Sequence, residues 1–442
     1  MNIYALSTGR GPSGIAIIRL SGKDTLTICK KLTKLKEIEK NEINFCKFYN
    51  PNNNNVIDPE TLLLWFPGPD SYTGEDLAEF QVHGSNAIIS AILSVLSKQQ
   101  NCRLAEPGEF TKLAFQNDKI DLLKAESIGD LIHSETELQR QQAVKLVQGN
   151  VSNYYNDLRE KIIKSLGLIE AKIDFAEEDL PEKVLKDAHK SIKEVYKDIS
   201  NIIEDNKIGE KIRDGFKISI TGEVNAGKSS LLNLLSKREA AIVSEEAGTT
   251  RDIIETYLNL DGYPVILADT AGIRMAKNEI EKKGINLAQK KFKEADLNIV
   301  VIDNSSKNIN DEIQKMINKD SIVLLNKSDV SDKQNHKLTA ETVLASVKNN
   351  KNIDKLINLI KTKLSKKISS NNSALITRER HRVKLNECLK EIDKFLKKDQ
   401  TKDLELAAED LRMATRHLGS IVGKVDVEEI LGSIFKDFCI GK

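Results

Sequence analysis

Two short motifs in the middle of the chain carry residue types that bind the phosphates of a nucleotide. Gly222–Ser229 reads G-E-V-N-A-G-K-S and fits the pattern G-x-x-x-x-G-K-[ST]. Its glycines let backbone N–H groups wrap phosphates at a helix N-terminus, Lys228 neutralises phosphate charge, and Ser229 offers an oxygen to Mg²⁺. A Gly-rich turn with a chance lysine is the alternative, and it is disfavoured because a strand-like run precedes the motif and a helical run follows it. Downstream, Asp269-Thr270-Ala271-Gly272 supplies a carboxylate that can hold Mg²⁺ through water and a glycine N–H for the γ-phosphate.

A third motif has the chemistry to select guanine. Asn326-Lys327-Ser328-Asp329 follows a strand-like run, and the Asp329 carboxylate can pair with the N1–H and exocyclic amine of guanine, which adenine lacks in that place. Ser346-Val347-Lys348 is expected to form the last loop on the guanine side. The motifs occur in the order found in GTPases, each at the end of a strand, and together they predict GTP binding.

The segment between the first two motifs, Gly248-Thr249-Thr250-Arg251-Asp252, resembles a switch loop, in which Thr250 would close on Mg²⁺ when the γ-phosphate is present. The residue after the second motif is Ile273, which cannot orient the attacking water as a glutamine does in Ras-type GTPases. Other side chains must then orient water or stabilise charge, and the residues alone leave four candidates open: Glu279, Glu281, Arg251 and Arg274.

These motifs need a parallel sheet to position them, and the sequence shows the required alternation of strand-like and helical runs from Phe216 to about Leu364. The expected strands are Lys217–Thr221, Val265–Ala268, Leu297–Asp303 and Ser321–Leu325. Residues 119–212 and 374–442 instead have the 3.6-residue apolar period of helices. We therefore expect an α/β P-loop GTPase domain (213–373) inserted into an all-α helical domain (119–212 and 374–442).

Residues 1–118 read as a separate α+β domain. Ile15–Leu20 and Thr61–Phe66 are strand candidates, and residues 85–97 have helical periodicity. Gly9–Gly14 fits G-x-G-x-x-G, but a strand rather than a helix follows it, so we expect a turn and no dinucleotide site.

The composition excludes several classes of function. The 442 residues include 67 basic and 66 acidic side chains, which argues against a polybasic nucleic-acid arm and against an acidic disordered chain. Aromatic residues make up 5%, too few for a base-stacking platform. The five cysteines are never spaced as C-x-x-C, so we expect neither a disulfide scaffold nor a cysteine zinc site. No signal peptide and no apolar run of about 20 residues is evident, so we expect a cytoplasmic protein without a membrane contact.

Cys439 stands near the C-terminus, where Gly441 and Lys442 do not fit a C-a-a-X prenylation box. A small buried hydrophobe and a reactive thiol are equally open interpretations of such a cysteine.

Taken together, these features resemble the MnmE (TrmE) family of tRNA-uridine modification GTPases over essentially the whole chain. The matching segments are Gly222–Ser229, Gly248–Asp252, Asp269–Arg274, Asn326–Asp329, Cys439–Lys442, Ile17–Gly22, Phe66–Pro69, Ser71–Asp76 and Asn117–Lys119. The resemblance implies that residues 1–118 form a tetrahydrofolate-binding domain that dimerises, so that the chain is a homodimer.

The resemblance also implies a reaction. It describes a K⁺-activated GTPase that works with the FAD-dependent protein MnmG, as a heterotetramer, on tRNA. Together they would add an aminomethyl or carboxymethylaminomethyl group to C5 of the wobble uridine. The one-carbon unit would come from a folate, 5-formyl- or 5,10-methylene-tetrahydrofolate.

Site residues follow from the same resemblance by position. K⁺ would replace an arginine finger and stabilise charge in the transition state; its matched ligands are Asn225, Ser244, Glu246 and Thr249. Family members usually carry an apolar residue where Glu246 stands, which bears on the K⁺ geometry unless the ligand there is a backbone carbonyl. The matched Mg²⁺ ligands are Ser229 and Thr250. The residues expected at GTP are Asn225, Ala226, Gly227, Lys228, Ser229, Ser230, Ser244, Glu245, Glu246, Ala247, Gly248, Thr249, Thr250, Asp269, Thr270, Ala271, Gly272, Asn326, Lys327, Asp329, Ser346, Val347 and Lys348.

Two matched residues have catalytic roles in the implied reaction. Glu281 matches the family's water-orienting glutamate, and Cys439 matches a cysteine of the modification chemistry. The positions matched to folate contacts are Arg19, Glu79, Lys119 and Lys442. A carboxylate suits the pterin edge, and basic groups suit the glutamyl carboxylates.

The main alternative is a GTP-switched ribosome-assembly factor with a similar G domain and no modification chemistry. An RNA-binding G-x-x-G module of the KH type would favour it, and we find none in the sequence. A helical scaffold with a degenerate G domain is a third interpretation, and the intact Lys228, Ser229, Asp269 and Asp329 disfavour it.

Overall fold

The computed structural model describes residues 1–9, 11–175, 182–205, 207–238, 255–269, 292–306, 309–330, 338–369, 375–398, 403–425, 431, 434–435 and 438–441. The chain divides into two compact units. Unit 1 contains residues 1–129, 146–163 and 412–442, and unit 2 contains residues 130–145 and 164–411.

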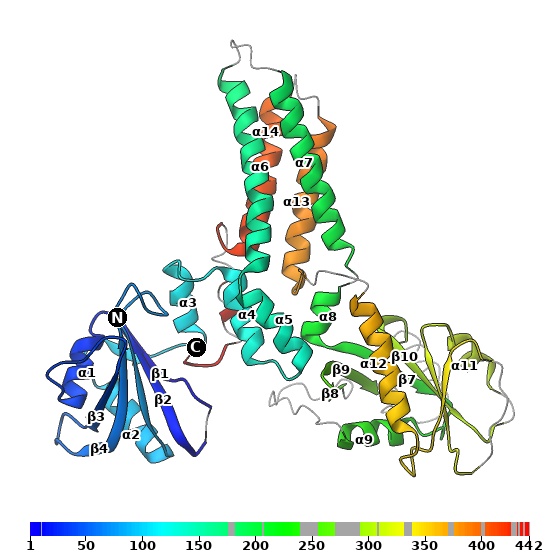
Figure 1. Ribbon diagram of the computed structural model, residues 1–442, viewed down its shortest axis with the longest axis horizontal. Coiled ribbons are helices and arrows are strands. Elements are labelled where there is room, and N and C mark those ends of the chain that lie inside the picture. The colour runs from blue at the N-terminus through cyan, green and yellow to red at the C-terminus, as the bar shows by residue number, and fades with distance from the viewer. Residues whose placement is uncertain are drawn as a thin grey trace, which may run out of the picture. The chain divides into compact units, whose positions relative to one another are not determined.

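In unit 1, the N-terminal residues form a sheet with helices α1 (Thr25–Thr33) and α2 (Asn86–Ser97) beside it (Figure 1). The sheet has six strands in the order β3-β4-β5-β2-β1-β6. Its strands are β1 (Asn2–Leu6), β2 (Ser13–Ser21), β3 (Ile43–Tyr49), β4 (Val56–Phe66), β5 (Leu77–Gly84) and β6 (Cys102–Leu104). Helices α1 and α2 bury alternate strand residues, including Ile18, Leu63 and Phe80, in one core on one face of the sheet. The predicted strands Ile15–Leu20 and Thr61–Phe66 and the predicted helix are confirmed; Ser85 caps α2 by accepting a hydrogen bond from the Ile88 N–H.

The opposite face of this sheet is more open. Arg19, Glu79 and Gln81 lie on it in cross-strand register and are half-buried. Helix α3 (Glu109–Gln116) covers part of the region through a smaller core with Ala5, Leu77 and Phe110. This leaves polar side chains of β2 and β5 available at a surface.

In unit 2, a second six-stranded sheet has the order β12-β11-β10-β7-β9-β8. Its strands are β7 (Phe216–Gly222), β8 (Glu255–Leu260), β9 (Tyr263–Asp269), β10 (Leu297–Asp303), β11 (Ile322–Asn326) and β12 (Glu341–Leu344). All neighbouring pairs are parallel except β8 and β9. The associated helices are α8 (Ile208–Asp214), α9 (Lys228–Arg238), α11 (Asp311–Met316) and α12 (Ile353–Ser369).

Strands β9, β10 and β11 of this second sheet are mainly apolar, as expected where both faces of a sheet are covered. One core contains Ile299 and Val301, and a second core contains the intervening Val300 and Ile302. The predicted strands are confirmed, with one shift: β11 begins at Ile322 rather than Ser321. The Asn318 side chain accepts a hydrogen bond from the Ser321 N–H, so Ser321 belongs to the preceding turn.

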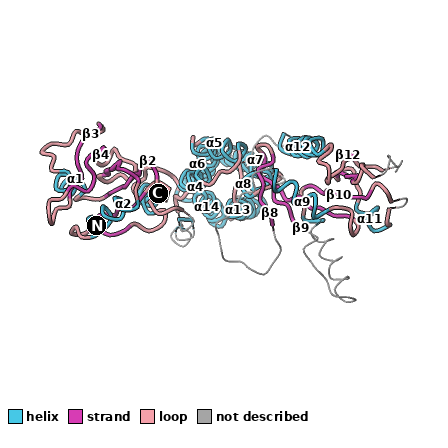
Figure 2. Tube along the Cα trace, turned by 90° about the horizontal axis from the view of Figure 1, so that it is seen from below, coloured by secondary structure: helices cyan, strands magenta, loops and turns pink. Residues whose placement is uncertain are grey.

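The remaining long helices are α4 (Leu122–Ile132), α5 (Glu137–Val147), α6 (Asn150–Asp174), α7 (Glu182–Ile203), α13 (Glu379–Lys397) and α14 (Leu404–Val422). Helices α7 and α13 lie side by side, and the rings of His189 and Phe395 are 6.0 Å apart (Figure 1, Figure 2). The sheet of unit 2 lies in the chain between α7 and α13. The predicted fold class, an α/β P-loop domain inserted into helices and preceded by an α+β domain, is confirmed.

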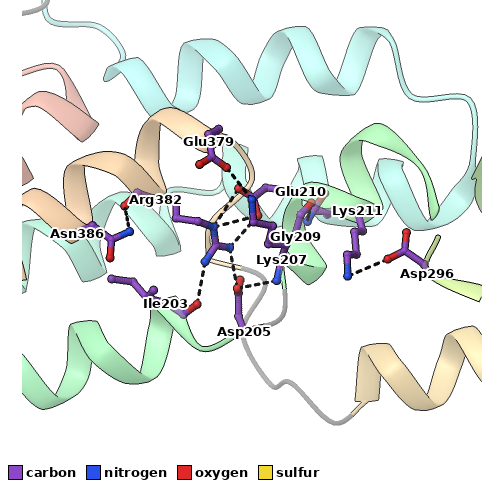
Figure 3. A network of polar contacts seen from close by, with 11 residues as sticks. Ile203, Asp205, Lys207, Gly209, Glu210, Lys211, Asp296, Glu379, Arg382 and Asn386 are labelled. Carbon is purple, nitrogen blue, oxygen red and sulfur yellow. Dashed lines mark hydrogen bonds and ion pairs between the residues drawn. The ribbon is translucent and has the colours of Figure 1, made fainter. Parts of the chain in front are cut away.

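The buried guanidinium of Arg382 links two parts of the chain (Figure 3). Arg382 lies in α13, which follows the sheet of unit 2 in the chain, and its partners precede the sheet. Arg382 of α13 is 2.7 Å from Asp205 and 2.7 Å from Glu210 of α8, and it also donates to the carbonyl oxygen of Ile203 at 2.8 Å. We call Arg382, Asp205 and Glu210 the Arg382 network. On the other side of α8, Lys211 forms an ion pair with Asp296 at 2.9 Å.

Among the helices within the described ranges, none combines the length and the apolarity needed to cross a membrane.

Candidate functional site

A pocket of about 650 Å³ opens at the carboxyl ends of the parallel strands in unit 2. This volume is within the range of small-molecule sites, and the carboxyl edge is where open α/β sheets bind ligands. The pocket brings together three segments that are distant in sequence, and its lining residues are Asn225, Gly227, Ser230, Asn233, Leu234, Lys237, Asn326, Lys327, Asp329, Val330, Val347 and Lys348. Eight of these twelve are residues that the sequence predicted to bind GTP.

The loop after β7 has a backbone that requires glycine at two places. Gly222 has φ +142°, and a Cβ on it would lie 2.0 Å from the carbonyl oxygen of Val301. Gly227 has φ +103°, and a Cβ on it would lie 2.2 Å from Nδ2 of Asn326. Lys228, the first residue of α9, donates from Nζ to the carbonyl oxygens of Gly222 at 2.9 Å and Glu223 at 2.7 Å. The ammonium therefore lies against the loop that would cradle phosphates.

Asn326 links the predicted phosphate loop to the predicted guanine loop. Its side chain is buried, and its Nδ2 donates to the carbonyl oxygen of Ala226 at 2.8 Å. Its Oδ1 accepts from the N–H of Val347 at 3.0 Å. Because one amide satisfies both contacts, the two predicted nucleotide loops share a fixed spacing.

Asp329, in the loop predicted to bind guanine, accepts hydrogen bonds that favour its carboxylate form. A hydrogen bond from Ser346, and one from its own backbone, lower the pKa of Asp329 below its usual range. Ser346 is buried and pairs through its backbone with Lys351. The predicted loop at Ser346–Lys348 thus stands beside Asp329, and its hydrogen bond stabilises the carboxylate form.

Two contributors to this site, Asp303 and Glu223, were not predicted from the sequence. Lys327 Nζ lies 2.5 Å from Oδ2 of Asp303, and Glu223 Oε1 accepts from the N–H of Asn310 at 3.1 Å. A signal for Asp303 was present, since it ends a predicted strand next to the strand that precedes Lys327. No local signal pointed to the contact of Glu223.

Part of the predicted site falls beyond what the structure describes. Asp269 is seen only as the last backbone position of β9. The predicted residues outside the described ranges are Ser244, Glu245, Glu246, Ala247, Gly248, Thr249, Thr250, Thr270, Ala271, Gly272, Glu281 and Lys442, and the alternatives Arg251, Arg274 and Glu279 lie there too.

A second group of predicted residues meets in unit 1. Arg19 of β2 and Glu79 of β5 are cross-strand partners, and Arg19 Nε donates to Glu79 Oε1 at 2.8 Å. The guanidinium carbon of Arg19 lies 5.6 Å from the centre of the Tyr72 ring. Arg19 also donates to the carbonyl oxygen of Gly441 at 3.5 Å.

That contact places the C-terminal segment beside Arg19. Ser7 Oγ donates to the Gly441 carbonyl at 3.0 Å, and the Gly108 N–H donates to the carbonyl oxygen of Cys439 at 3.3 Å. The Cys439 side chain is exposed. The predicted folate positions Arg19 and Glu79 therefore lie beside the C-terminal segment that carries Cys439.

Lys119, a third predicted folate position, lies against the turn at Gly74. A Cβ on Gly74, which has φ +78°, would lie 3.2 Å from Cε of Lys119. The same turn is held by Asn117, whose Nδ2 donates to the carbonyl oxygen of Thr73 at 2.6 Å. Lys119 is thus next to the loop that carries Tyr72.

In the part of the chain that can be described, no cluster of three or more His, Cys, Asp or Glu side chains is arranged to hold a metal ion. Mg²⁺ at a P-loop is held instead by one hydroxyl and one aspartate together with the phosphates of the nucleotide. Ser229 at the start of α9 fits the role of the hydroxyl ligand, and Asp269 ends β9.

Comparison with known proteins covers the whole chain. The family model described as GTP-binding protein TrmE N-terminus matches residues 2–119, and the model described as MnmE helical domain matches residues 122–439. The tRNA modification GTPase MnmE of Pelagibacter ubique (strain HTCC1062) is 57% identical over 448 residues, with 100% of both chains covered. The MnmE of Rickettsia bellii (strain RML369-C) is 42% identical over 446 residues, covering 100% of this chain and 99% of its own.

Among solved structures, the G domain of the T. maritima FeoB iron transporter is 25% identical, covers 35% of this chain and 98% of its own, and has a TM-score of 0.26. The assignment of the chain rests on the family models and on the full-length relatives. By those two comparisons, the chain belongs to the MnmE family of tRNA modification GTPases.

Proposed function

We propose that this GTPase binds GTP in the pocket between the loop after β7 and the loops after β11 and β12. The observation that carries the proposal is the convergence of residues from Gly222–Ser229, Asn326–Asp329 and Ser346–Lys348 in one pocket, fixed by the two hydrogen bonds of Asn326. The proposed domains are residues 1–118, residues 119–212 with 374–442, and the G domain at 213–373.

Three of the described residues, Asp329, Lys228 and Ser229, would each have a defined task in binding. Asp329, held ionised, would accept the N1–H and the amine of guanine, while Lys228 would leave its carbonyl partners for the β- and γ-phosphates. Mg²⁺ would neutralise charge on the phosphates, with Ser229 as a ligand and Thr250, by the resemblance, as another. Adenine would be rejected because it leaves the acceptor of Asp329 without its paired donors.

We propose further that K⁺ activates hydrolysis, with Asn225 as a ligand together with Ser244, Glu246 and Thr249. Asn225 lines the pocket and has a left-handed backbone with φ +61°, consistent with a side chain presented at the loop. Glu281 would orient the attacking water.

The test of this site is steady-state GTP hydrolysis in KCl and in NaCl at matched ionic strength. We expect strong stimulation by K⁺ in the natural protein and in an Asn358→Ala control, in which an exposed asparagine of α12 is removed. The Asn225→Ala variant should lose the stimulation. Equal slow rates in both salts for the natural protein would refute the K⁺ mechanism and favour a GTP-switched assembly factor.

We propose that the substrate is tRNA, as the names of the relatives state for those proteins, and that the partner is the flavoprotein MnmG in a heterotetramer. The modified position would be C5 of the wobble uridine, and a tetrahydrofolate derivative would supply the one-carbon unit. The support in the structure is the grouping of Arg19, Glu79 and the Cys439 segment in unit 1.

Folate binding can be tested by titration with 5-formyl-tetrahydrofolate. The Arg19→Gln variant should bind it at least tenfold more weakly, since a charged hydrogen bond is lost. Arg103→Gln is the matched control, because Arg103 also pairs with a carboxylate, Glu109, in the same domain. Equal affinity of both variants and the natural protein would remove Arg19 from the folate site.

We propose that the first domain also forms the homodimer. Ile43 and Phe45 are two residues apart on the edge strand β3, so their side chains lie on the same face of the sheet. Phe45 is 80% exposed. An exposed apolar pair on a sheet edge is typical of an interface. Light scattering should show a dimer for the natural protein and for Lys36→Glu, a surface control, and a monomer for Phe45→Asp; a dimeric Phe45→Asp would place the interface elsewhere.

A further inference from the structure

The side chain of Lys327 has a partner outside the three nucleotide motifs. Its Nζ lies 2.5 Å from Oδ2 of Asp303, the last residue of β10. Asp303 is the register partner of Asn326 on the neighbouring parallel strand, so it stands across the strand end from the residue that follows Asn326. Lys327 lines the pocket together with Asp329 and Lys348.

Asp303 is itself held in place. Its Oδ1 accepts hydrogen bonds from the backbone N–H of Ser305 at 2.9 Å and from Oγ of Ser305 at 2.6 Å. One carboxylate oxygen thus closes the turn after β10 while the other faces Lys327. Burial raises the pKa of Asp303, but the hydrogen bonds from Lys327 and Ser305 outweigh this effect and hold it below its usual range.

A second contact fixes the same connection to the phosphate side. Glu223, in the loop after β7, accepts from the N–H of Asn310, just before α11. The backbone N–H of Asn304 donates to the carbonyl oxygen of Asn326 at 2.9 Å. The connection from β10 to α11 is therefore bonded to both motifs that line the pocket.

We propose that Asp303 is a positioning residue for guanine-nucleotide binding, which acts by holding the ammonium of Lys327 in the pocket. The inference rests on the proposed function of that pocket. A free lysine side chain samples many rotamers, and a ligand that had to immobilise it would bind more weakly. The ion pair with Asp303 fixes Lys327 before the nucleotide arrives, so less order is lost on binding.

The first experiment compares GTP hydrolysis and GDP binding in the natural protein and in Asp303→Asn, which keeps the shape and removes the charge. We expect the KM for GTP and the Kd for GDP to rise about tenfold, the equivalent of one charged hydrogen bond, with kcat within twofold. Asp303→Glu, which keeps the charge, should recover most of the affinity. The matched control is Glu341→Gln. Glu341 is an exposed carboxylate of β12, in the same sheet, and pairs with Lys363 of α12. Its replacement should leave the KM for GTP and the Kd for GDP unchanged.

A double-variant cycle shows whether Asp303 acts through Lys327. The variant with both Asp303→Asn and Lys327→Met should bind GDP no more weakly than Lys327→Met alone. Additive losses, an unchanged KM in Asp303→Asn, or a fall in kcat together with the melting temperature would each overturn the inference. Unchanged GDP binding by Lys327→Met would instead overturn the proposed nucleotide pocket, so the two failures are distinguishable.

Discussion

Replacing Arg382 with methionine tests whether the Arg382 network holds α8 to α13. The Arg382 side chain is 8% exposed, and Asp205 and Glu210 are 4% and 10% exposed. Methionine keeps much of the volume but removes the cation that both carboxylates share. Removing one partner from a buried ion pair costs about 3–5 kcal/mol, because the remaining charge stays out of water.

Hydrogen exchange followed by mass spectrometry measures this loss where it occurs. If exchange in α8 and α13 requires the network to open, a cost of about 3–5 kcal/mol accelerates exchange there by roughly two to four orders of magnitude. The control is Lys394→Met in the same helix, where the lysine side chain is 58% exposed and pairs with Glu391. A surface pair contributes about 0–1 kcal/mol, so this control should exchange no more than about fivefold faster.

A second variant separates buried charge from lost packing. Adding Glu210→Gln to Arg382→Met removes one of the two buried charges and should restore part of the protection, which makes the two effects non-additive. Affinity for GDP should stay within twofold, because no member of the network lines the nucleotide pocket. Equal exchange in Arg382→Met and Lys394→Met would refute the reasoning, since burial of the charge would then have no measurable cost.

Other predictions address the sites directly. Asn326→Ala should weaken GDP binding at least about tenfold in a fluorescence titration, because it releases two loops of the pocket. Glu281→Ala should leave GTP affinity nearly intact and slow single-turnover hydrolysis by about 10² or more; an unchanged rate would show that Glu281 is misassigned. Cys439→Ser should retain GTP hydrolysis and abolish tRNA modification, and retained modification would make the thiol structural. A hydrogen bond with buried Asp58 raises the pKa of His83, so the imidazolium should stabilise the first domain below pH ~6.5. This stability is lost as the pH rises through the raised pKa, so the difference in melting temperature between the natural protein and His83→Gln should shrink between pH 6 and 9.

Local sequence patterns were sufficient to predict six of the twelve strands in the described residues, namely β2, β4, β7, β9, β10 and β11. The apolar run Leu297–Asp303 is β10 without change, and the rejected dinucleotide motif does lead into β2. Such predictions succeed because strand alternation, helix capping and turn chemistry depend on residues a few positions apart. Asp303 ends the predicted strand Leu297–Asp303, so a search of every predicted strand end would have selected it together with Asp269.

Contacts between distant segments had no such signal. Arg382 and Glu210 are 172 residues apart, and Arg19 and Gly441 are 422 residues apart. Which carboxylate a given arginine meets depends on strand order and helix packing, and neither leaves a spacing pattern in the chain. The order β3-β4-β5-β2-β1-β6, in which β1 and β6 pair in parallel, belongs to the same class of information.

The two proposed sites nonetheless share one physical arrangement. In unit 1 a carboxylate of β5 holds Arg19 of β2, and in unit 2 a carboxylate at the end of β10 holds Lys327 just after β11. In each case the cation and its acceptor come from neighbouring strands. The register of the two strands places the backbones of the two residues close together. A cation held in this way is charged and oriented before any ligand binds, so binding loses less conformational entropy. The arrangement also predicts that neutralising the acceptor weakens ligand binding through the cation, a coupling that double-variant cycles at Glu79–Arg19 and Asp303–Lys327 should both detect.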